Sequence, residues 1–309
     1  MPDPIPVSFR TTLAHGLRRA AAPLLGLTIV ALALWGLYGM LHETDPRDIV
    51  AALRALPPAQ AAMALACTGL SFLALTLYDR LSLHWLGMDW GWRRSAPGTA
   101  LAYAVGNVSF NALVVGGAVR YSAWRARGLQ PGQAAGVALF ASLGFWLGYL
   151  CVGGLLFATD PLRPPLRLAG LLLLAPPLYL LLAWRLRGVR LGRWRMPLPP
   201  PRVCAGQIAV GMLDLLGISG VLWLLLPAMP GLSYSHFLQA FMLAVVAGSA
   251  SQAPGGLGVF DSAFLLLLPA GAPVPQAVAA LLAFRVIYYG VPLLAAGAAL
   301  AWRRLWRRR

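Results

Sequence analysis

Lysine is absent from this 309-residue chain, and all 25 of its basic side chains are arginines. Without lysine, the chain cannot perform Schiff-base catalysis or supply the phosphate-binding lysine of a nucleotide-binding P-loop. The simplest explanation of this absence is genomic base composition. Charge is scarce as well, because charged residues make up 11% of the chain, whereas soluble domains carry about 25%.

Residues that commonly bind metals are few and dispersed. The three cysteines, Cys67, Cys151 and Cys204, lie in or beside apolar segments and fit no zinc-site spacing. The four histidines form no cluster along the sequence. We therefore expect no metal site and no cofactor, and we assign the cysteines to packing.

Long apolar runs are what the sequence has in abundance: 59% of its residues are hydrophobic and its mean hydropathy is +0.71. About 20 apolar residues suffice for a helix to cross a bilayer, so the sequence predicts an all-α polytopic membrane protein with a single domain over 1–309. Residues 22–41 are too long for a signal peptide and are expected to stay as the first helix. The apolar segments fall at about 22–41, 60–86, 98–118, 133–158, 166–184, 203–229, 236–269 and 276–302.

The arginines gather beside the apolar runs, as expected for residues that set membrane topology. Six lie in the connector 185–202, five lie in the tail 303–309, and three lie in the N-terminal segment 1–20. We therefore place these three regions, and both termini, in the cytoplasm. The net charge of +16 is thereby assigned to topology, and nucleic acid is not expected as a partner.

This placement conflicts with eight uninterrupted spans, because the connector 185–202 would then follow five crossings and face outward. The conflict disappears if 98–118 and 236–269 each enter the membrane and return on the same side. Both segments contain a polar, glycine-rich interruption, which is tolerated at membrane depth only inside protein or beside water. We therefore predict about six spanning helices plus two re-entrant helical hairpins of opposite orientation; the alternative is an even number of ordinary spans. The predicted breaks include Gly116 and Gly117 in the first hairpin, and Pro254, Gly255, Gly256 and Gly258 in the second.

Several charged residues stand within or beside these apolar runs, where each would cost about 3 kcal/mol at the bilayer centre. One interpretation is structural pairing, for example of Arg285 with Asp261 or Asp214. Asp261 could instead cap a half-helix, Asp79 could lie at the interface, and Arg120 could only set topology. The functional interpretation is a polar pathway in which arginines hold a phosphate and carboxylates bind an ammonium group or relay a proton. The candidate binding residues are Asp79, Arg120, Asp214, Asp261 and Arg285, with Asn107, Asn111 and Tyr288.

Several of these residues belong to motifs that resemble a known family. GGAVRY (116–121), FASLGFWLG (140–148), PGGLGVFD (254–261) and FRVIYYGVP (284–292), with YD at 78–79 and LDLL at 213–216, resemble the flippase domain of the bacterial multiple peptide resistance factor. This domain defines the lysylphosphatidylglycerol synthase transmembrane family. The resemblance implies a helical bundle with re-entrant helices that moves lipids, including aminoacylated phosphatidylglycerol, between leaflets and contributes to antimicrobial peptide resistance. It also implies that the charged candidates occupy the polar cavity of the family.

The chain ends directly after its last apolar segment, so we expect a stand-alone member without the aminoacyl-transferase domain, and not an enzyme. The leading hypothesis is a lipid translocase, or flippase, that acts on membrane phospholipids. Two alternatives stay open: an integral-membrane enzyme acting on lipid-linked substrates, and a non-catalytic partner of a separate lipid or polysaccharide synthase. Self-association into a homo-oligomer is left open as well.

Overall fold

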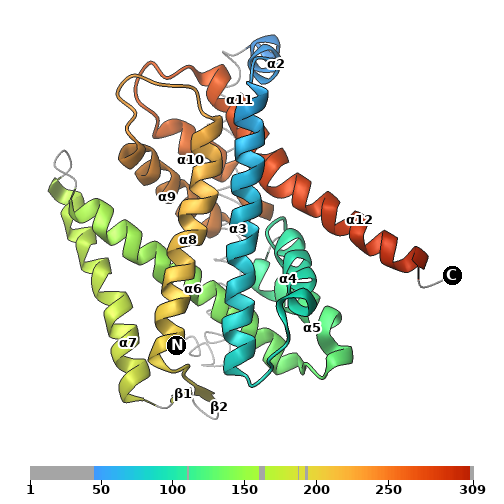
Figure 1. Cartoon of the computed structure of the whole chain (residues 1–309). Coiled ribbons are helices and arrows are strands. Elements are labelled where there is room, and N and C mark those ends of the chain that lie inside the picture. The colour runs from blue at the N-terminus through green and yellow to red at the C-terminus, as the bar shows by residue number, and fades with distance from the viewer. Residues whose placement is uncertain (1–44, 110, 160–163, 187, 192–193, 307–309) are drawn as a thin grey trace, which may run out of the picture.

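The computed structural model of the chain describes residues 45–109, 111–159, 164–186, 188–191 and 194–306. These residues form a bundle of helices, joined by short loops and one small β-hairpin (Figure 1). The all-α prediction is therefore confirmed. The N-terminal segment 1–20, the predicted first span 22–41 and the end of the tail at 307–309 lie outside the described residues.

Four helices in the described ranges are long and apolar enough to cross a membrane. Three of them are α3 (Pro58–Trp85), α6 (Pro131–Ala158) and α8 (Pro201–Leu225). Each of these begins with proline, whose fixed φ suits the first helical position and whose missing N–H is not needed there. The fourth, Val274–Ala299, runs through α11 (Val274–Phe284), η4 (Arg285–Gly290) and most of α12 (Val291–Trp306).

The element η4 is a π-helix, and Pro292 explains why it forms there. Proline has no N–H to donate to the carbonyl of Tyr288 four residues earlier, and its ring would collide with that carbonyl. A local change from i→i+4 to i→i+5 hydrogen bonding relieves both problems. The helix therefore changes its pitch at Arg285, one of the predicted site residues.

The predicted span 166–184 is shorter than the others. It consists of a 3₁₀ helix, η2 (Pro164–Leu174), followed by α7 (Ala175–Arg185). Two further elements were not predicted. The helix α2 (Pro46–Arg54) begins at Asp45, whose carboxylate accepts a hydrogen bond from the Arg47 amide at 2.8 Å. An antiparallel hairpin of β1 (Gly188–Leu191) and β2 (Trp194–Pro197) lies in the arginine-rich connector.

Glycines let two of the long helices cross at very short range. A Cβ atom placed on Gly211 of α8 would lie 2.1 Å from the carbonyl oxygen of Gly144 in α6. One placed on Gly148 would lie 2.3 Å from the Gly211 backbone. Small residues allow such close approach between helices in a membrane, where packing replaces the hydrophobic effect as the source of association. The crossing fixes α8, and with it Asp214, relative to α6.

Both segments that were predicted to be re-entrant hairpins fold as two helices on either side of a break. The first hairpin consists of α4 (Trp92–Gly106) and α5 (Ala112–Trp124), and the second of α9 (Tyr234–Ser251), η3 (Pro254–Gly256) and α10 (Val259–Leu266). In Figure 1 the first hairpin lies beside the lower half of α3 and the second beside the upper half of α8, so they occupy opposite ends of the bundle. The fold therefore uses two broken elements of opposite orientation, and not a series of uninterrupted spans.

The position of the first break differs from the prediction. Gly116 and Gly117 lie inside α5, and the chain turns instead at 107–111. Gly116 faces the Arg120 side chain, whose Nη1 would be 2.9 Å from an added Cβ, and Gly117 packs against Ala138 of α6. The two glycines are therefore packing positions, because their missing side chains make room for an arginine and for a neighbouring helix.

Candidate functional site

Asparagines form both edges of the break in the first hairpin. Asn107 follows the last residue of α4, and Asn111 is the N-cap of α5, where its side chain accepts a hydrogen bond from the Val114 amide at 3.0 Å. Between them, the Ser109 hydroxyl donates to the Gly106 carbonyl at 2.6 Å. Side-chain oxygens thus satisfy backbone groups that the interrupted helix leaves free.

A buried ion pair ties this hairpin to the bundle. Arg120 of α5 donates from Nε and Nη2 to the two carboxylate oxygens of Asp79 in α3, at 2.9 Å each. The Thr99 hydroxyl of α4 donates to the same carboxylate at 2.9 Å. Asp79 is fully buried and Arg120 is 3% exposed. The two side chains therefore form a desolvated ion pair between α3 and α5.

The break in the second hairpin depends on left-handed backbone. Gln252, Gly255, Gly256 and Gly258 all have φ between +56° and +78°. Glycine adopts such angles without steric cost, so three glycines in four residues allow the chain to reverse within a short distance. The turn ends at Gly258, the N-cap of α10, whose amide donates to the Asp261 carboxylate at 3.0 Å. The predicted break at 254–258 is confirmed.

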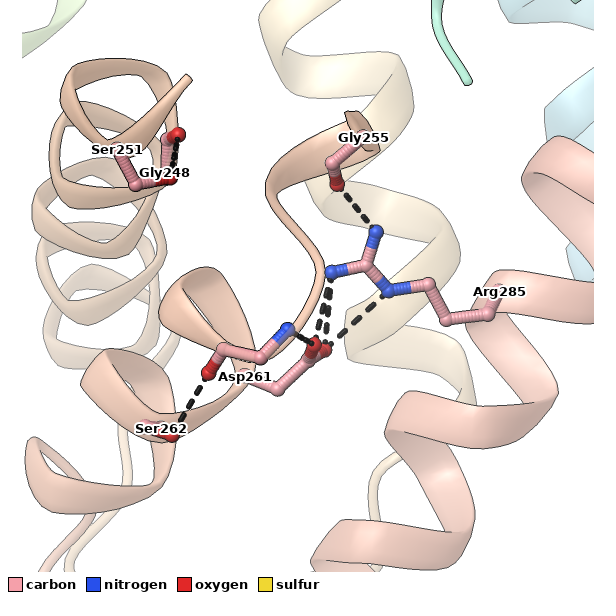
Figure 2. Close-up of polar contacts among 7 residues, drawn as sticks. Gly248, Ser251, Gly255, Asp261, Ser262 and Arg285 are labelled. Carbon is pink, nitrogen blue, oxygen red and sulfur yellow. Dashed lines mark hydrogen bonds and ion pairs between the residues drawn. The ribbon is translucent and has the colours of Figure 1, made fainter. Parts of the chain in front are cut away.

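Asp261 caps α10 and also binds Arg285 (Figure 2). Arg285 Nη2 donates to the two Asp261 oxygens at 2.9 and 3.1 Å, and Nε lies 3.3 Å from one of them. Nη1 of Arg285 donates to the Gly255 carbonyl in the break. Both side chains are 15% exposed. Of the pairs expected from sequence, the structure contains Arg285 with Asp261 and not Arg285 with Asp214.

The two breaks meet inside the molecule. A Cβ atom on Gly255 would lie 3.2 Å from the carbonyl oxygen of Asn107, and 3.9 Å from the Cα of Val108. Beside this contact lies a cavity of about 480 Å³. Its wall contains most of the predicted polar residues, namely Asn107, Asn111, Arg120, Asp214 and Tyr288, together with Gly255 and Gly256.

Other predicted residues are close to the cavity but do not line it: Asp79, Asp261 and Arg285. Each arginine is held by a carboxylate, and the Gly258 amide is held by Asp261. The groups that were predicted to hold a phosphate, the two arginines and the amide at the start of the half-helix, are thus each paired with a carboxylate in this structure. The Arg120 guanidinium still reaches the cavity wall, with Nη1 as the nitrogen that Asp79 does not hold.

Asp214 of α8 differs from the other two buried carboxylates. It is 6% exposed and lines the cavity. In the part of the chain that the structure describes, no arginine or histidine lies within 4 Å of it. Its polar neighbour is the Ser71 hydroxyl of α3, which is 3.3 Å from the Tyr288 hydroxyl.

Tyr288 is buried inside the protein. Its side chain is 2% exposed and stacks on Phe284, with ring centroids 5.6 Å apart. Two further tyrosines of the site were missed. Tyr103 of α4 lies beneath the Arg120 guanidinium at 4.7 Å, and Tyr78 of α3 is buried on the cavity wall. Tyr78 immediately precedes Asp79 in the YD motif, so the sequence did contain a signal for it.

These features define a class of protein. Broken helices from opposite ends that meet beside a polar cavity are the architecture expected of membrane transport proteins with inverted elements. The protein is an all-α polytopic membrane protein of this architecture.

The comparison with known families identifies which group it belongs to. The chain is a member of the family described as the lysylphosphatidylglycerol synthase transmembrane region, which matches residues 24–296. An uncharacterised protein of Synechocystis sp. is 32% identical over 288 residues, which cover 90% of this chain and 89% of that protein. The Inner membrane protein YbhN of Escherichia coli is 26% identical over 240 residues, which cover 73% of this chain and 74% of YbhN. The resemblance found in the motifs is therefore confirmed.

Proposed function

We propose that this protein is a lipid translocase that moves a phospholipid between the two leaflets of the bacterial inner membrane. The observation that carries the proposal is the polar cavity beside the contact between the two hairpin breaks, with Arg120 and Asp214 in its wall. A hairpin that enters from one face and another that enters from the opposite face can open the cavity to the two leaflets in turn. Membership of a family named for lipid metabolism supports a lipid as the substrate.

The chemistry of the wall indicates which head groups to test first. Arg120 Nη1 offers a donor for a phosphate, and Asp214 offers an anionic group for a cation. The rings of Tyr288, Trp146 and Phe260 add faces to which an ammonium group is attracted. A phospholipid that carries both charges, such as an aminoacylated phosphatidylglycerol, would match both of these groups. An aminoacylated phosphatidylglycerol is therefore the head group to test first.

We also propose an orientation with both termini in the cytoplasm. In Figure 1 the open end of the first hairpin, the end of α7 and the β1–β2 hairpin lie together at the lower end of the bundle. Many of the arginines belong to these regions, including Arg93 and Arg94 of the first hairpin and Arg127 just after it, and arginine-rich loops stay on the cytoplasmic side. Cysteine labelling in cells should find position 231 accessible from outside and the termini accessible only after permeabilisation. The opposite pattern at position 231 would overturn the orientation.

The transport proposal is tested with purified protein in liposomes that contain a fluorescent lipid. Dithionite reduces the fluorophore only in the outer leaflet, so transbilayer movement appears as quenching beyond one half. We expect faster movement than in protein-free vesicles, and slower movement for Arg285→Ala and Asp261→Asn with folding intact. A rate equal to that of empty vesicles for anionic, zwitterionic and aminoacylated phospholipids would overturn the proposal.

A second candidate is a non-catalytic partner of a separate lipid synthase, because the family is described as the transmembrane region of a synthase. A translocase, by contrast, moves the lipid across the bilayer without changing it chemically. Incubating the proteoliposomes with the labelled lipid and analysing the products separates these possibilities. An unchanged lipid that has crossed the bilayer supports transport, whereas a chemically altered lipid would show an enzyme. If the lipid is neither altered nor moved, the partner role remains, and co-purification with a synthase would then support it.

A further inference from the structure

Asp214 is the starting point, because its environment differs from that of the other buried carboxylates. Asp79 has Arg120, and Asp261 has Arg285. Among the described residues, Asp214 has the Ser71 hydroxyl of α3 as its polar neighbour, and it shares the cavity wall with Tyr78 of α3, Tyr103 of α4, and Tyr288 and Tyr289 of η4. The nearest cation in the cavity wall is Arg120, which Asp79 already neutralises.

An ionised carboxylate that is buried without a cation is strongly disfavoured, so it binds a proton or acquires a positive partner. In this protein a proton and a cationic partner would both reach Asp214 through the same cavity. Asp214 lines a cavity of about 480 Å³, large enough to admit a lipid head group as well as water. The position of the carboxylate therefore lets a proton and a cationic group compete for it.

We propose that Asp214 binds a proton and the ammonium group of a phospholipid alternately, which makes transport an exchange of lipid for H⁺. This inference rests on the proposed lipid transport. When the cavity is empty, Asp214 is protonated and neutral. An entering ammonium head group displaces that proton to water, and the lipid leaves only when a proton returns. Each crossing of the lipid in one direction is thereby linked to one proton in the other.

The surrounding hydroxyls suit both forms of Asp214. A hydroxyl can donate to a carboxylate or accept from a carboxylic acid, so the same neighbours serve the charged and the neutral state. Ser71 and Tyr288 already face each other at 3.3 Å. The Tyr78 hydroxyl is buried and has no hydrogen-bond partner among the described residues, so it remains available. An arginine in this position would bind the carboxylate permanently and abolish the exchange.

The experiment measures proton release when a lipid binds. The full chain in an uncharged detergent and weak buffer is mixed with dioctanoyl phosphatidylethanolamine, and a pH indicator reports released H⁺. We expect about one proton per bound lipid wherever Asp214 starts protonated, and lipid affinity that rises about tenfold per pH unit over that range. Dioctanoyl phosphatidylglycerol, which lacks the amine, should release none.

Variants locate the site. Asp214→Asn should release no proton and bind the amine lipid with an affinity independent of pH. The matched control is Asp89→Asn, which removes a carboxylate that is 75% exposed and far from the cavity wall. It should behave as the unmodified protein. If Asp214→Asn does not fold, the pH series on the unmodified protein still decides the question.

Three results would overturn the proposal: binding of the amine lipid without proton release between about pH 5 and pH 9, unchanged release in Asp214→Asn, or no binding of the amine lipid at all. The proposed function can fail separately. Lipid binding with proton release but without movement across liposomes would refute transport and keep the exchange site. Transport that neither a pH gradient nor Asp214→Asn affects would refute the exchange and keep the transport.

Discussion

The two re-entrant hairpins carry the same kind of ion pair with the charges interchanged. In the first hairpin the arginine, Arg120, is on the hairpin and the carboxylate, Asp79, is on the neighbouring span α3. In the second the carboxylate, Asp261, is on the hairpin and the arginine, Arg285, is on the neighbouring helix. Each hairpin is thus connected to a spanning helix by a guanidinium–carboxylate contact on its second half.

The pairs differ in how deeply they are buried. Asp79 and Arg120 are 0% and 3% exposed, whereas Asp261 and Arg285 are each 15% exposed. Arg285 also holds the backbone of the break in the second hairpin through the Gly255 carbonyl, and Asp261 caps α10. A fully desolvated pair is costly to separate, and a partly solvated pair can be exchanged for water or ligand. We therefore expect the contact of the second hairpin to separate more readily than that of the first.

Breaking the first pair should have the largest effect on stability. Asp79→Asn leaves Arg120 as an unpaired buried cation, so we expect a loss of about 3–5 kcal/mol in the free energy of unfolding. Thermal unfolding in detergent measures this loss. The double variant Asp79→Asn with Arg120→Gln removes both charges and should recover part of it. Equal stability of the single and double variants would contradict the assignment of a desolvated pair.

Breaking the second pair should cost less stability and more transport. Asp261→Asn keeps a side chain that can accept from the Gly258 amide, and water can reach Arg285, so we expect a loss of about 2 kcal/mol. The rate of lipid movement should fall more than it does in a variant elsewhere in the protein that loses the same amount of stability. A loss as large as that of Asp79→Asn would show that the two pairs are equivalent.

The contact between the breaks can be tested with one methyl group. Gly255→Ala puts a side chain on left-handed backbone, which costs about 1–2 kcal/mol. It also places a Cβ 3.2 Å from the Asn107 carbonyl oxygen. Gly271→Ala is the matched control, because Gly271 has φ +81° and open space around its Cβ. Both variants should lose similar stability, and only Gly255→Ala should change transport. Equal transport by the two would mean that the contact has no part in it.

The smallest effect should come from the pair at the surface. Asp89 lies 2.6 Å from His84 at the end of α3, but both side chains are more than two-thirds exposed. Exposed pairs contribute little because water and salt screen them. We expect Asp89→Asn to leave the unfolding midpoint and the transport rate unchanged, as measured in the same two assays.

The sequence was sufficient to locate both hairpins, because two independent signals agreed. The arginine count required two non-spanning segments, and each coincided with a polar interruption. The sequence was less informative about where the first hairpin turns. A Gly-Gly pair serves equally well at a turn or in a helix that packs closely, so Gly116 and Gly117 were assigned to a break that lies at 107–111.

The pairing of charges could be predicted only where the alternatives were few. Arg285 had two candidate partners, and the structure contains one of them. Asp79 and Arg120 are 41 residues apart on different elements, and no local pattern connects them. The isolation of Asp214 depends on the packing of α3, α4 and η4 around it, which sequence periodicity does not specify. The two elements outside the membrane segments, α2 and the β1–β2 hairpin, were missed because the search followed apolar runs.

The contact between Asn107 and Gly255 also bears on how much low-dielectric material a charged group must cross between the two ends of the bundle. A bilayer presents about 30 Å of low-dielectric material to a charged head group, and the energetic penalty grows with the charge that must enter it. In this protein the polar breaks of the two hairpins meet inside the molecule, so polar backbone and not hydrocarbon occupies that part of the path. Under the proposed function, this backbone contact would separate the head group from the other side of the bilayer, and a displacement of either hairpin would open it.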